Sequence, residues 1–505
     1  MYVIFMNGRD YMAEEKTKAA SFEAGQAIYD ATTLGTPRMV VLGLQHMFAM
    51  FGATVLVPLI TGLDVSTTLL FAGLGTLLFH FITKMKVPAF LGSSFAFLGG
   101  YAAITGLADE SMTQAQLLPY ACFGVACAGL VYLILAAVIR AFGTAKVMKY
   151  FPPVVTGPII IAIGLGLAPT AISSCKSNWL VAIAALVVVI LFNIWGIGMM
   201  RIIPIIMGVI VSYIVAVLCH DVDFTPIKEA AWIGFPIHWD STVFGGIDYS
   251  NSSLILTAVI AIVPIALATM MEHIGDISAI SATVGKNYLA DPGLHRTLTG
   301  DGLATFMASL FGAPANTTYG ENTGVLALTR VYDPRVIRIA AGFAALLSFS
   351  PKFAAIIQTI PSATVGGISF VLYGMISAAG LRNLVESHVD FSKSRNLIIA
   401  AVILVCSLGL KFQLVDGALF DGLSFSIGSL NITLSALAVG SIAGILLNAI
   451  LPGKDYIFDE SDPHDTGADL SFENVALEKQ KAYGEKKAKE KAAVKKLKVK
   501  ASETK

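Results

Sequence analysis

Long apolar runs dominate this chain, and its polar positions gather in the short segments between them. A run of roughly 17 to 25 apolar residues is long enough to cross the hydrocarbon core of a bilayer as a helix. We count about fourteen such segments, some of them interrupted by glycine or proline. The clearest are 39–60, 117–139, 180–197, 203–219, 254–271, 397–410 and 432–451. The pattern therefore predicts an all-α membrane protein.

Composition supports this prediction. The chain has 505 residues, of which 55% are hydrophobic and only 13% are charged, and a soluble protein of this size would need a more polar surface. Residues 1–21 alternate apolar and charged side chains without a small-residue cleavage site, so we expect the first helix to anchor the chain. The five cysteines are scattered without metal-ligand spacing, and we interpret them as packing residues.

The distribution of Lys and Arg among the short loops predicts the orientation. If the N-terminus is cytoplasmic, the inner loops hold most of these residues, whereas the outer segment 219–250 carries four aspartates and one lysine. We therefore expect a multi-pass protein of the plasma membrane with both termini in the cytoplasm. The predicted divisions are an N-terminal segment 1–38, a first repeat 39–220, an outer loop 221–253, a second repeat 254–451 and a Lys-rich tail 452–505.

The Lys-rich tail allows two interpretations. It is either an arm for nucleic acid or anionic lipid, or a solvated segment that binds nothing specific. The formal net charge of the whole chain is zero, because the tail balances acidic residues elsewhere. We therefore favour the solvated segment and expect no nucleic-acid partner.

Two apolar segments are broken by residues that disfavour helix. "VPAFLGSSFAFLGG" interrupts the third segment and "FGAPANTTYGEN" interrupts the tenth, about 230 residues later. Their matching positions predict two repeats of seven helices, and a repeat with an odd number of spans inserts upside down relative to its copy. Non-helical backbone persists at membrane depth only where it is buried in protein or lines a cavity. We therefore expect Gly320 and its neighbours to present backbone N–H groups to a ligand.

Ionisable residues within an apolar span are candidates for substrate binding or ion coupling. Glu272 and Asp276 are four residues apart and share a helix face, whereas His273 points about 100° away. Two carboxylates on one buried face disfavour joint ionisation, so one of them should hold a proton. The alternative is that the helix ends at the membrane surface and leaves these residues in water. A metal site is disfavoured, because adjacent residues do not converge on one ion.

Several sequence motifs resemble those of a known transporter family. "LQHMFAMFGATVLVP", "VPAFLGSSFAF", "EHIGD" and "NTTYGENTGVLALTRVY" resemble the nucleobase–ascorbate transporter family, most closely its bacterial uracil permeases. The resemblance extends over about residues 42–451. It implies fourteen helices in two inverted repeats, core and gate domains, a short strand pair formed by the third and tenth segments, and a homodimer.

The resemblance also implies site residues. Substrate contacts would come from Glu272, Tyr319, Gly320, Glu321 and the backbone of Phe95, with Ala53 and Tyr373 covering the ring. Asp276, Asn322 and Ser94 would support the site or the coupling. Uracil permeases of the family place a second histidine where this chain has Asp276, whereas purine carriers resemble this chain at that position. Glu321 resembles the uracil branch, since purine carriers more often have glutamine there.

These residues suit a neutral, planar base whose ring N–H donors alternate with carbonyl acceptors. Carboxylates accept from the N–H groups and backbone amides donate to the carbonyls, and a mismatched partner costs ~1 to 3 kcal/mol. We expect secondary active, proton-coupled uracil uptake by alternating access, without a cofactor. The alternatives are a symporter for xanthine or another base and, more remotely, a channel or an intramembrane enzyme. No nucleophile or metal set accompanies the carboxylates, and no P-loop string is present.

Overall fold

The computed structural model describes residues 27–453 apart from 111, 198, 199, 201, 202, 416, 417, 421, 428 and 429. Most of the predicted N-terminal segment and nearly all of the predicted Lys-rich tail therefore lie outside the described residues. The five predicted divisions of the chain stay a prediction.

Helices make up most of the described chain. The first half contains α2 (Thr36–Thr61), α3 (Val65–Ile82), α4 (Leu98–Thr105), α5 (Gln114–Phe142), α6 (Thr144–Met148), α7 (Pro153–Cys175), α8 (Trp179–Trp195) and α10 (Pro204–Leu218). Two short helices follow, α11 (Thr225–Glu229) and α12 (Val243–Gly246). The second half contains α13 (Ser252–Ile262), α14 (Ala266–Val284), α15 (Leu294–Leu310), α16 (Gly320–Thr329), α17 (Pro334–Leu347), α18 (Pro351–Gln358), α19 (Ser362–Glu386), α20 (Ser394–Leu404) and α21 (Ala436–Ile450).

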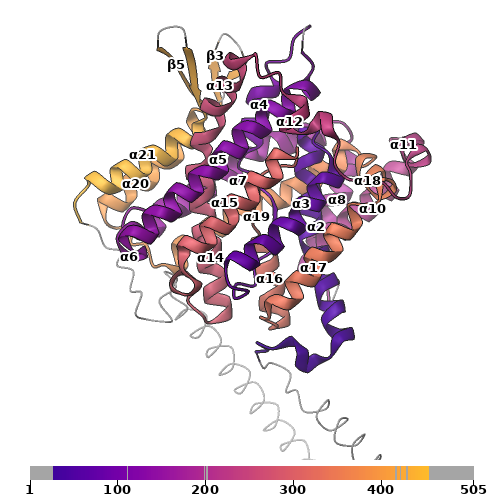
Figure 1. Cartoon of the computed structure of the whole chain (residues 1–505), viewed down its shortest axis with the longest axis horizontal. Helices are drawn as coiled ribbons and strands as arrows, with labels where there is room; N and C mark the ends of the chain where they lie inside the picture. Colours follow the sequence, from indigo (N-terminus) through magenta and orange to yellow (C-terminus); the bar gives the residue numbers. More distant parts are fainter. Residues whose placement is uncertain are drawn as a thin grey trace, which may run out of the picture.

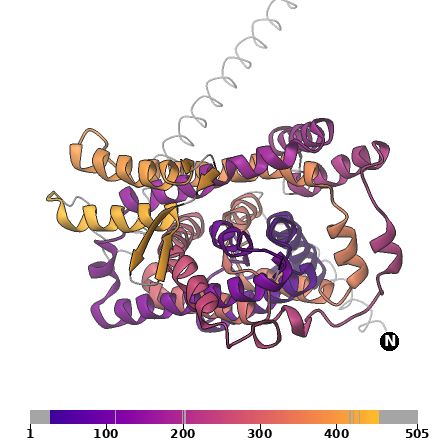
Figure 2. The same cartoon turned by 90° about the horizontal axis from the view of Figure 1, so that it is seen from above.

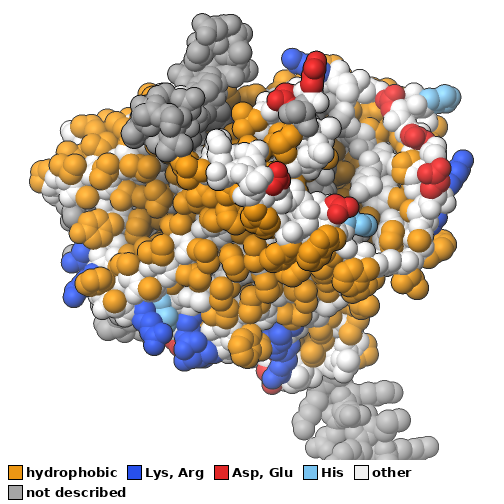
Figure 3. All heavy atoms as spheres, turned by 45° about the horizontal axis from the view of Figure 1, so that its top comes forward, with side chains coloured by type: hydrophobic (Ala, Val, Ile, Leu, Met, Phe, Trp, Pro, Cys, Tyr) orange, Lys and Arg blue, Asp and Glu red, His pale blue; other side chains and the backbone are white. Residues whose placement is uncertain are grey.

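Many of these helices are long and apolar enough to cross a membrane. Among the described residues six helices meet this criterion, and α17 with α18 forms a further span that is bent by 89°. Four more apolar helices are shorter. Figure 3 shows hydrophobic side chains spread over a broad band, with Lys and Arg gathered along its lower edge and most Asp and Glu in view nearer the opposite edge. The chain is a multi-pass helical membrane protein, whereas the count of fourteen helices stays a prediction.

Polar residues at the helix ends explain several of the boundaries. The Asp64 side chain accepts a hydrogen bond from the Thr67 N–H at the start of α3. Thr113 and Gln116 form a reciprocal capping box at the start of α5. These bonds satisfy amide groups that have no acceptor within the helix. α14 ends at Gly285, whose φ of +72° suits a residue without a Cβ.

The two broken segments meet in the interior. β1 (Leu91–Ser93) pairs antiparallel with β2 (Asn316–Thr318), and Gly92 lies opposite Thr317. All six residues are buried. The pairing satisfies backbone groups that would otherwise be exposed to a medium without hydrogen-bond partners. The predicted strand pair is confirmed.

Four further strands were not predicted. β3 (Gln413–Val415) pairs with β4 (Ala418–Phe420), and β5 (Leu423–Ile427) pairs with β6 (Leu430–Leu434). The helix predicted from residue 432 begins instead at Ala436. The Asp-Gly step at 416–417 and the alternation of polar and apolar residues in 423–434 are hairpin signals that the prediction overlooked. These hairpins lie at the top of Figure 1.

The helices pack in two sets. α15 packs against α5 and α3, and α17 packs against α2 and α3. In the other set α19 packs against α7 and α8, while α20 and α21 pack against α7. Seen from above, α20 and α21 lie along one side of the molecule and the indigo helices α2 and α3 lie nearer its centre (Figure 2).

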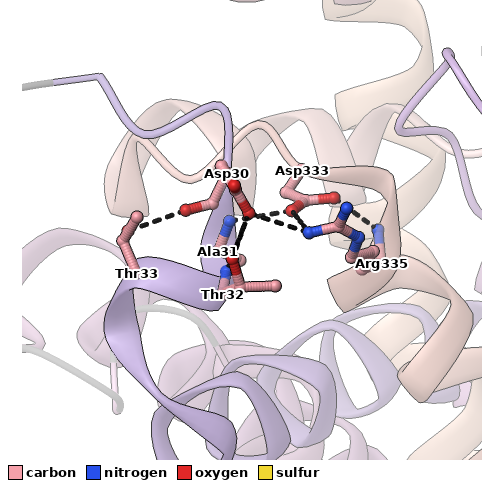
Figure 4. A network of polar contacts seen from close by, with 6 residues as sticks. All are labelled: Asp30, Ala31, Thr32, Thr33, Asp333 and Arg335. Carbon is pink, nitrogen blue, oxygen red and sulfur yellow. Dashed lines mark hydrogen bonds and ion pairs between the residues drawn. The ribbon is translucent and has the colours of Figure 1, made fainter.

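Residues before α2 form a strap across the ends of three helices. The Ile28 N–H donates to the Arg330 carbonyl oxygen, and the Tyr29 hydroxyl donates to the Val284 carbonyl oxygen at 2.8 Å. Figure 4 shows Asp30 and Asp333 close together, with Arg335 within reach of both carboxylates. The strap therefore connects the end of α14 to the link between α16 and α17.

Candidate functional site

Two short helices begin where the paired strands end. α4 follows β1 closely, and α16 follows β2 directly. Neither helix has a side-chain hydrogen bond at its N-cap, which is Phe97 in α4 and Tyr319 in α16. The first amide groups of a helix have no acceptor within it and carry partial positive charge. The strand pair therefore brings two sets of backbone donors into one buried region.

The Tyr319 side chain connects the strand pair to α2 by hydrogen bonds. Its hydroxyl donates to the Ser93 carbonyl oxygen at 3.0 Å and lies 3.3 Å from the Thr54 hydroxyl. The Ser93 hydroxyl donates to the Thr54 carbonyl oxygen at 2.9 Å. A Cβ on Gly92 would lie 2.4 Å from the Tyr319 ring, so only glycine fits there. Tyr319, which the sequence predicted as a substrate contact, is 4% exposed and links β1 to α2.

The acidic residues of α14 border the strand pair. Glu272 and Asp276 are both half-buried, and α14 packs against β2 and α16. The Thr318 hydroxyl donates to Asp276 Oδ2 at 2.9 Å. α14 continues beyond Asp276 to Val284, with buried residues in its last turns. Asp276 thus lies within the helix and has a direct partner in β2.

His273 points toward a partner that the sequence analysis missed. His273 Nδ1 lies 2.9 Å from Asp301 Oδ2, and both side chains are fully buried. The two atoms are close enough for an ion pair when the imidazole is protonated. Their geometry does not meet the criteria for a hydrogen bond. The His273 ring also meets Phe79 edge to face. Asp301 lies in α15 between the buried residues Gly300 and Gly302, and an acid between small residues in the middle of a helix is the signal that would have identified it.

Gly320 is exposed although residues 312–319 before it are buried. A Cβ on Gly320 would meet only Asp276 Oδ1, at 4.0 Å. There is therefore open space beside the first turn of α16 and next to the α14 carboxylates. The backbone of Glu321 belongs to this turn, but its side chain lies outside the described part of the structure.

Asn322 contacts another residue that was not predicted. Its amide nitrogen donates to the His46 carbonyl oxygen at 3.2 Å and lies 3.3 Å from His46 Nδ1. His46 is a fully buried residue of α2. The contact fixes α16 to α2 across 276 residues of sequence, and the supporting role of Asn322 in the site stays a prediction.

The remaining predicted residues form an apolar wall. Ala53, Phe95, Tyr319 and Tyr373 belong to one cluster of buried residues. The Phe95 and Tyr373 rings meet edge to face with centroids 5.7 Å apart. Tyr373 is on α19, so this contact joins the two sets of helices. The Ser94 N–H donates to the Ala315 carbonyl oxygen at 2.8 Å, and the buried Ser94 hydroxyl has no hydrogen-bond partner among the described residues.

The arrangement brings carboxylates, backbone donors and aromatic rings together around one strand pair. Such a set can hold a flat, neutral molecule with alternating donors and acceptors. Within the described ranges no group of three or more His, Cys, Asp or Glu side chains is placed to hold a metal ion.

The fold of this chain is similar to that of solved membrane transporter structures. A murine anion transporter, Slc26a9 in its inward-facing state, superposes with a TM-score of 0.58 at 11% identity, over 86% of this chain and 70% of that one. At this identity the likeness concerns the fold alone.

Sequence comparisons identify the family. Residues 37–415 match the profile of the Permease family of xanthine and uracil permeases. The uracil permease of Bacillus caldolyticus is 40% identical over 86% of this chain and 97% of its own length. The putative pyrimidine permease RutG of Escherichia coli K12 is 38% identical over 86% of this chain and 94% of its own. These relatives are named as permeases and not as enzymes. The chain therefore belongs to the nucleobase–ascorbate transporter family of permeases.

Proposed function

We propose that this protein is a secondary active nucleobase transporter whose preferred substrate is uracil. The main observation behind this proposal is the β1–β2 strand pair. The helices α4 and α16 begin where its strands end, beside the carboxylates of α14. The relatives named as uracil permeases support uracil as the substrate.

The chemistry of the site suits uracil. Glu272 and Glu321 would accept hydrogen bonds from the ring N–H groups, and the backbone amides near Phe95 and Gly320 would donate to the carbonyl oxygens. Open space beside Gly320 leaves room for the ring edge. Tyr373 and Ala53 would cover the faces of the ring. A base with a different order of donors and acceptors would leave one of these groups unpaired, at a cost of ~1 to 3 kcal/mol.

The transport cycle would rest on alternating access coupled to protons. Glu272 and Asp276 are one turn apart on α14, so one proton shared between them would lower their mutual repulsion. The two sets of helices would act as core and gate domains, and the Phe95–Tyr373 contact would lie between them. Fourteen spans in two inverted repeats, a homodimer and cytoplasmic termini in the plasma membrane complete the proposal. The basic edge in Figure 3 supports this orientation.

The test is uptake of labelled uracil into proteoliposomes with and without an inward proton gradient. A panel of unlabelled bases that includes thymine and xanthine would compete with the label. We expect uracil to compete best and the proton gradient to drive accumulation. Stronger competition by xanthine than by uracil would show that xanthine is the preferred substrate. Accumulation driven only by a sodium gradient would show that sodium is the coupling ion. Chemical change of the solute during transport would contradict the carrier itself.

A further inference from the structure

A cavity of about 150 Å³ lies away from the strand pair, where the start of α7 meets the ends of α19, α20 and α21. Lys149, Lys393 and Arg395 line it together with His388 and one acidic residue, Asp390. We call this cavity the basic cleft. In Figure 1 it belongs to the region of α6, α20 and α21.

The charge of the basic cleft is positive. Its three basic side chains outweigh the single carboxylate, whose Oδ1 already accepts bonds from the Ser392 N–H and hydroxyl. These bonds lower the pKa of Asp390, so it stays ionised at neutral pH and limits the net charge to about +2. α20 also begins here, with Lys393 at its N-cap and no side-chain cap. Amide groups at such a helix start favour an anion.

Arg395 is held rigidly at the wall of the cleft. Its Nη2 donates to the Asn448 carbonyl oxygen at 3.1 Å and to Asn448 Oδ1 at 2.7 Å. Asn448 in turn donates to the Lys149 carbonyl oxygen at 2.9 Å. Arg395 Nε is buried and has no hydrogen-bond partner among the described residues. The contacts with Asn448 hold the guanidinium of Arg395 in a fixed position beside the cleft, where its charge adds to that of the two lysines.

Exposed apolar side chains occur on the three helices whose ends meet α7 at the basic cleft. Leu397 and Ile398 on α20, Val385 on α19 and Ile450 on α21 are all strongly exposed, with Ile450 at 76%. A phosphate in the cleft could therefore carry acyl chains along this surface. A basic pocket between helices is a known kind of site for lipid headgroups, and a soluble phosphate ester offers the same anionic oxygens.

We propose that the basic cleft binds the anionic phosphate group of a phosphate ester. The bound group would receive hydrogen bonds from the first amides of α20, with Lys149, Lys393 and Arg395 supplying positive charge. This site is separate from the substrate site, so the proposal does not depend on which base is transported.

The test uses native mass spectrometry of the purified full-length protein in a non-ionic detergent. The protein is titrated with phosphatidylglycerol, with phosphatidylcholine of the same acyl chains, and with glycerol phosphate. The variant is Lys149→Gln/Lys393→Gln, which leaves the Arg395–Asn448 contact in place. The matched control is Lys84→Gln/Lys146→Gln, which removes two charges from exposed positions outside the cleft.

We expect the wild type to retain phosphatidylglycerol more strongly than phosphatidylcholine. The cleft variant should bind it about thirty-fold more weakly, since each lysine contributes roughly a five-fold gain. Competition by glycerol phosphate would identify soluble esters as ligands, and retention of the lipid alone would identify a membrane headgroup. Either result supports the site. Equal retention of phosphatidylglycerol by the wild type and the cleft variant, or an equal loss in the control variant, would overturn it.

Discussion

Thr318 of β2 donates its hydroxyl hydrogen to the Asp276 carboxylate of α14 at 2.9 Å. The bond joins the strand pair to the helix that carries both predicted acids. This bond is compatible with two roles for Asp276. The carboxylate either binds and releases protons during the transport cycle, or it only holds β2 in place. The two roles lead to different outcomes for substitutions at the two ends of the bond.

Asp276→Asn removes the titratable group and keeps the size of the side chain. If Asp276 carries protons, uracil should still bind, because Glu272 and Glu321 remain, and accumulation against a gradient should collapse. Thr318→Val is the matched control, since it removes the bond but leaves the carboxylate, and it should retain coupled uptake. The measurement pairs equilibrium binding with uptake under an imposed proton gradient. Undiminished accumulation by Asp276→Asn would assign the residue a local structural role.

Glu272→Gln should weaken uracil binding by about ten- to a hundred-fold. A hydrogen bond to a charged acceptor is worth ~1.5 to 3 kcal/mol, and the amide is a poorer acceptor for a ring N–H. Glu229→Gln, an exposed position in α11, serves as the control for loss of one carboxylate. Binding isotherms at equal protein concentration provide the comparison. Wild-type affinity in Glu272→Gln would remove this residue from the proposed site.

Gly320→Val should abolish binding while the protein still folds. The structure leaves open space for a Cβ at Gly320, so the added methyl groups would occupy the volume proposed for the ring edge. Gly324→Val is the control, because Gly324 lies one turn further along α16 and a Cβ there would meet no atom within 4 Å. Thermal unfolding checks the fold, and a binding assay checks the site. Unchanged binding in Gly320→Val would mean that the substrate lies elsewhere.

The buried pair of His273 and Asp301 should show energetic coupling. Replacing each residue by alanine should destabilise the protein, and the double variant should lose less than the sum, with a coupling of roughly 0.5 to 3 kcal/mol. Unfolding free energies from detergent titrations supply the four values. A cycle of Asp301→Ala with Ser278→Ala is the control, since the Ser278 hydroxyl donates within its own helix. Additive effects for His273 and Asp301 would show that their contact carries no energy.

The strap before α2 should respond to acid through Asp30. Hydrogen bonds from the Thr32 hydroxyl and N–H, followed by the Arg335 charge, hold the pKa of Asp30 below its ordinary value of 3.8. Its contribution to stability is therefore present above about pH 3.8 and lost as the pH falls through the lowered pKa. The melting temperature of Asp30→Asn should lie slightly below that of the wild type at pH 7, and the difference should vanish in acid.

Asp333, at the start of α17, contacts the strap and provides a contrast to Asp30. It is 4% exposed and accepts a bond from the buried Ala31 N–H at 2.8 Å. Asp333→Ala should cost ~1 to 3 kcal/mol at pH 7, because it leaves that N–H without an acceptor. A larger loss of melting temperature in Asp30→Asn than in Asp333→Ala would contradict this account of the strap.

Local sequence patterns were enough to locate many of the apolar helices and the two segments that break. Apolar runs such as 117–139 became helices because a lipid environment forces backbone groups to bond within their own segment. Proline and glycine near 88–92 and 314–320 cannot continue a helix at low cost, so the breaks could be predicted as well. The four-residue spacing of Glu272 and Asp276 is likewise a local property of a helix.

The contacts between residues far apart in sequence could not be predicted in this way. Asn322 reaches His46, Tyr319 reaches Ser93, and His273 reaches Asp301 through the packing of separate helices. The hairpins of β3 to β6 are a different case, because the Asp-Gly step at 416–417 and the alternation in 423–434 are local signals from which they could have been predicted. Local periodicity specifies the face that a residue takes on its own element. The partner across that face depends on how whole elements pack, because side-chain shape and hydrogen-bond satisfaction are settled only when both surfaces come together.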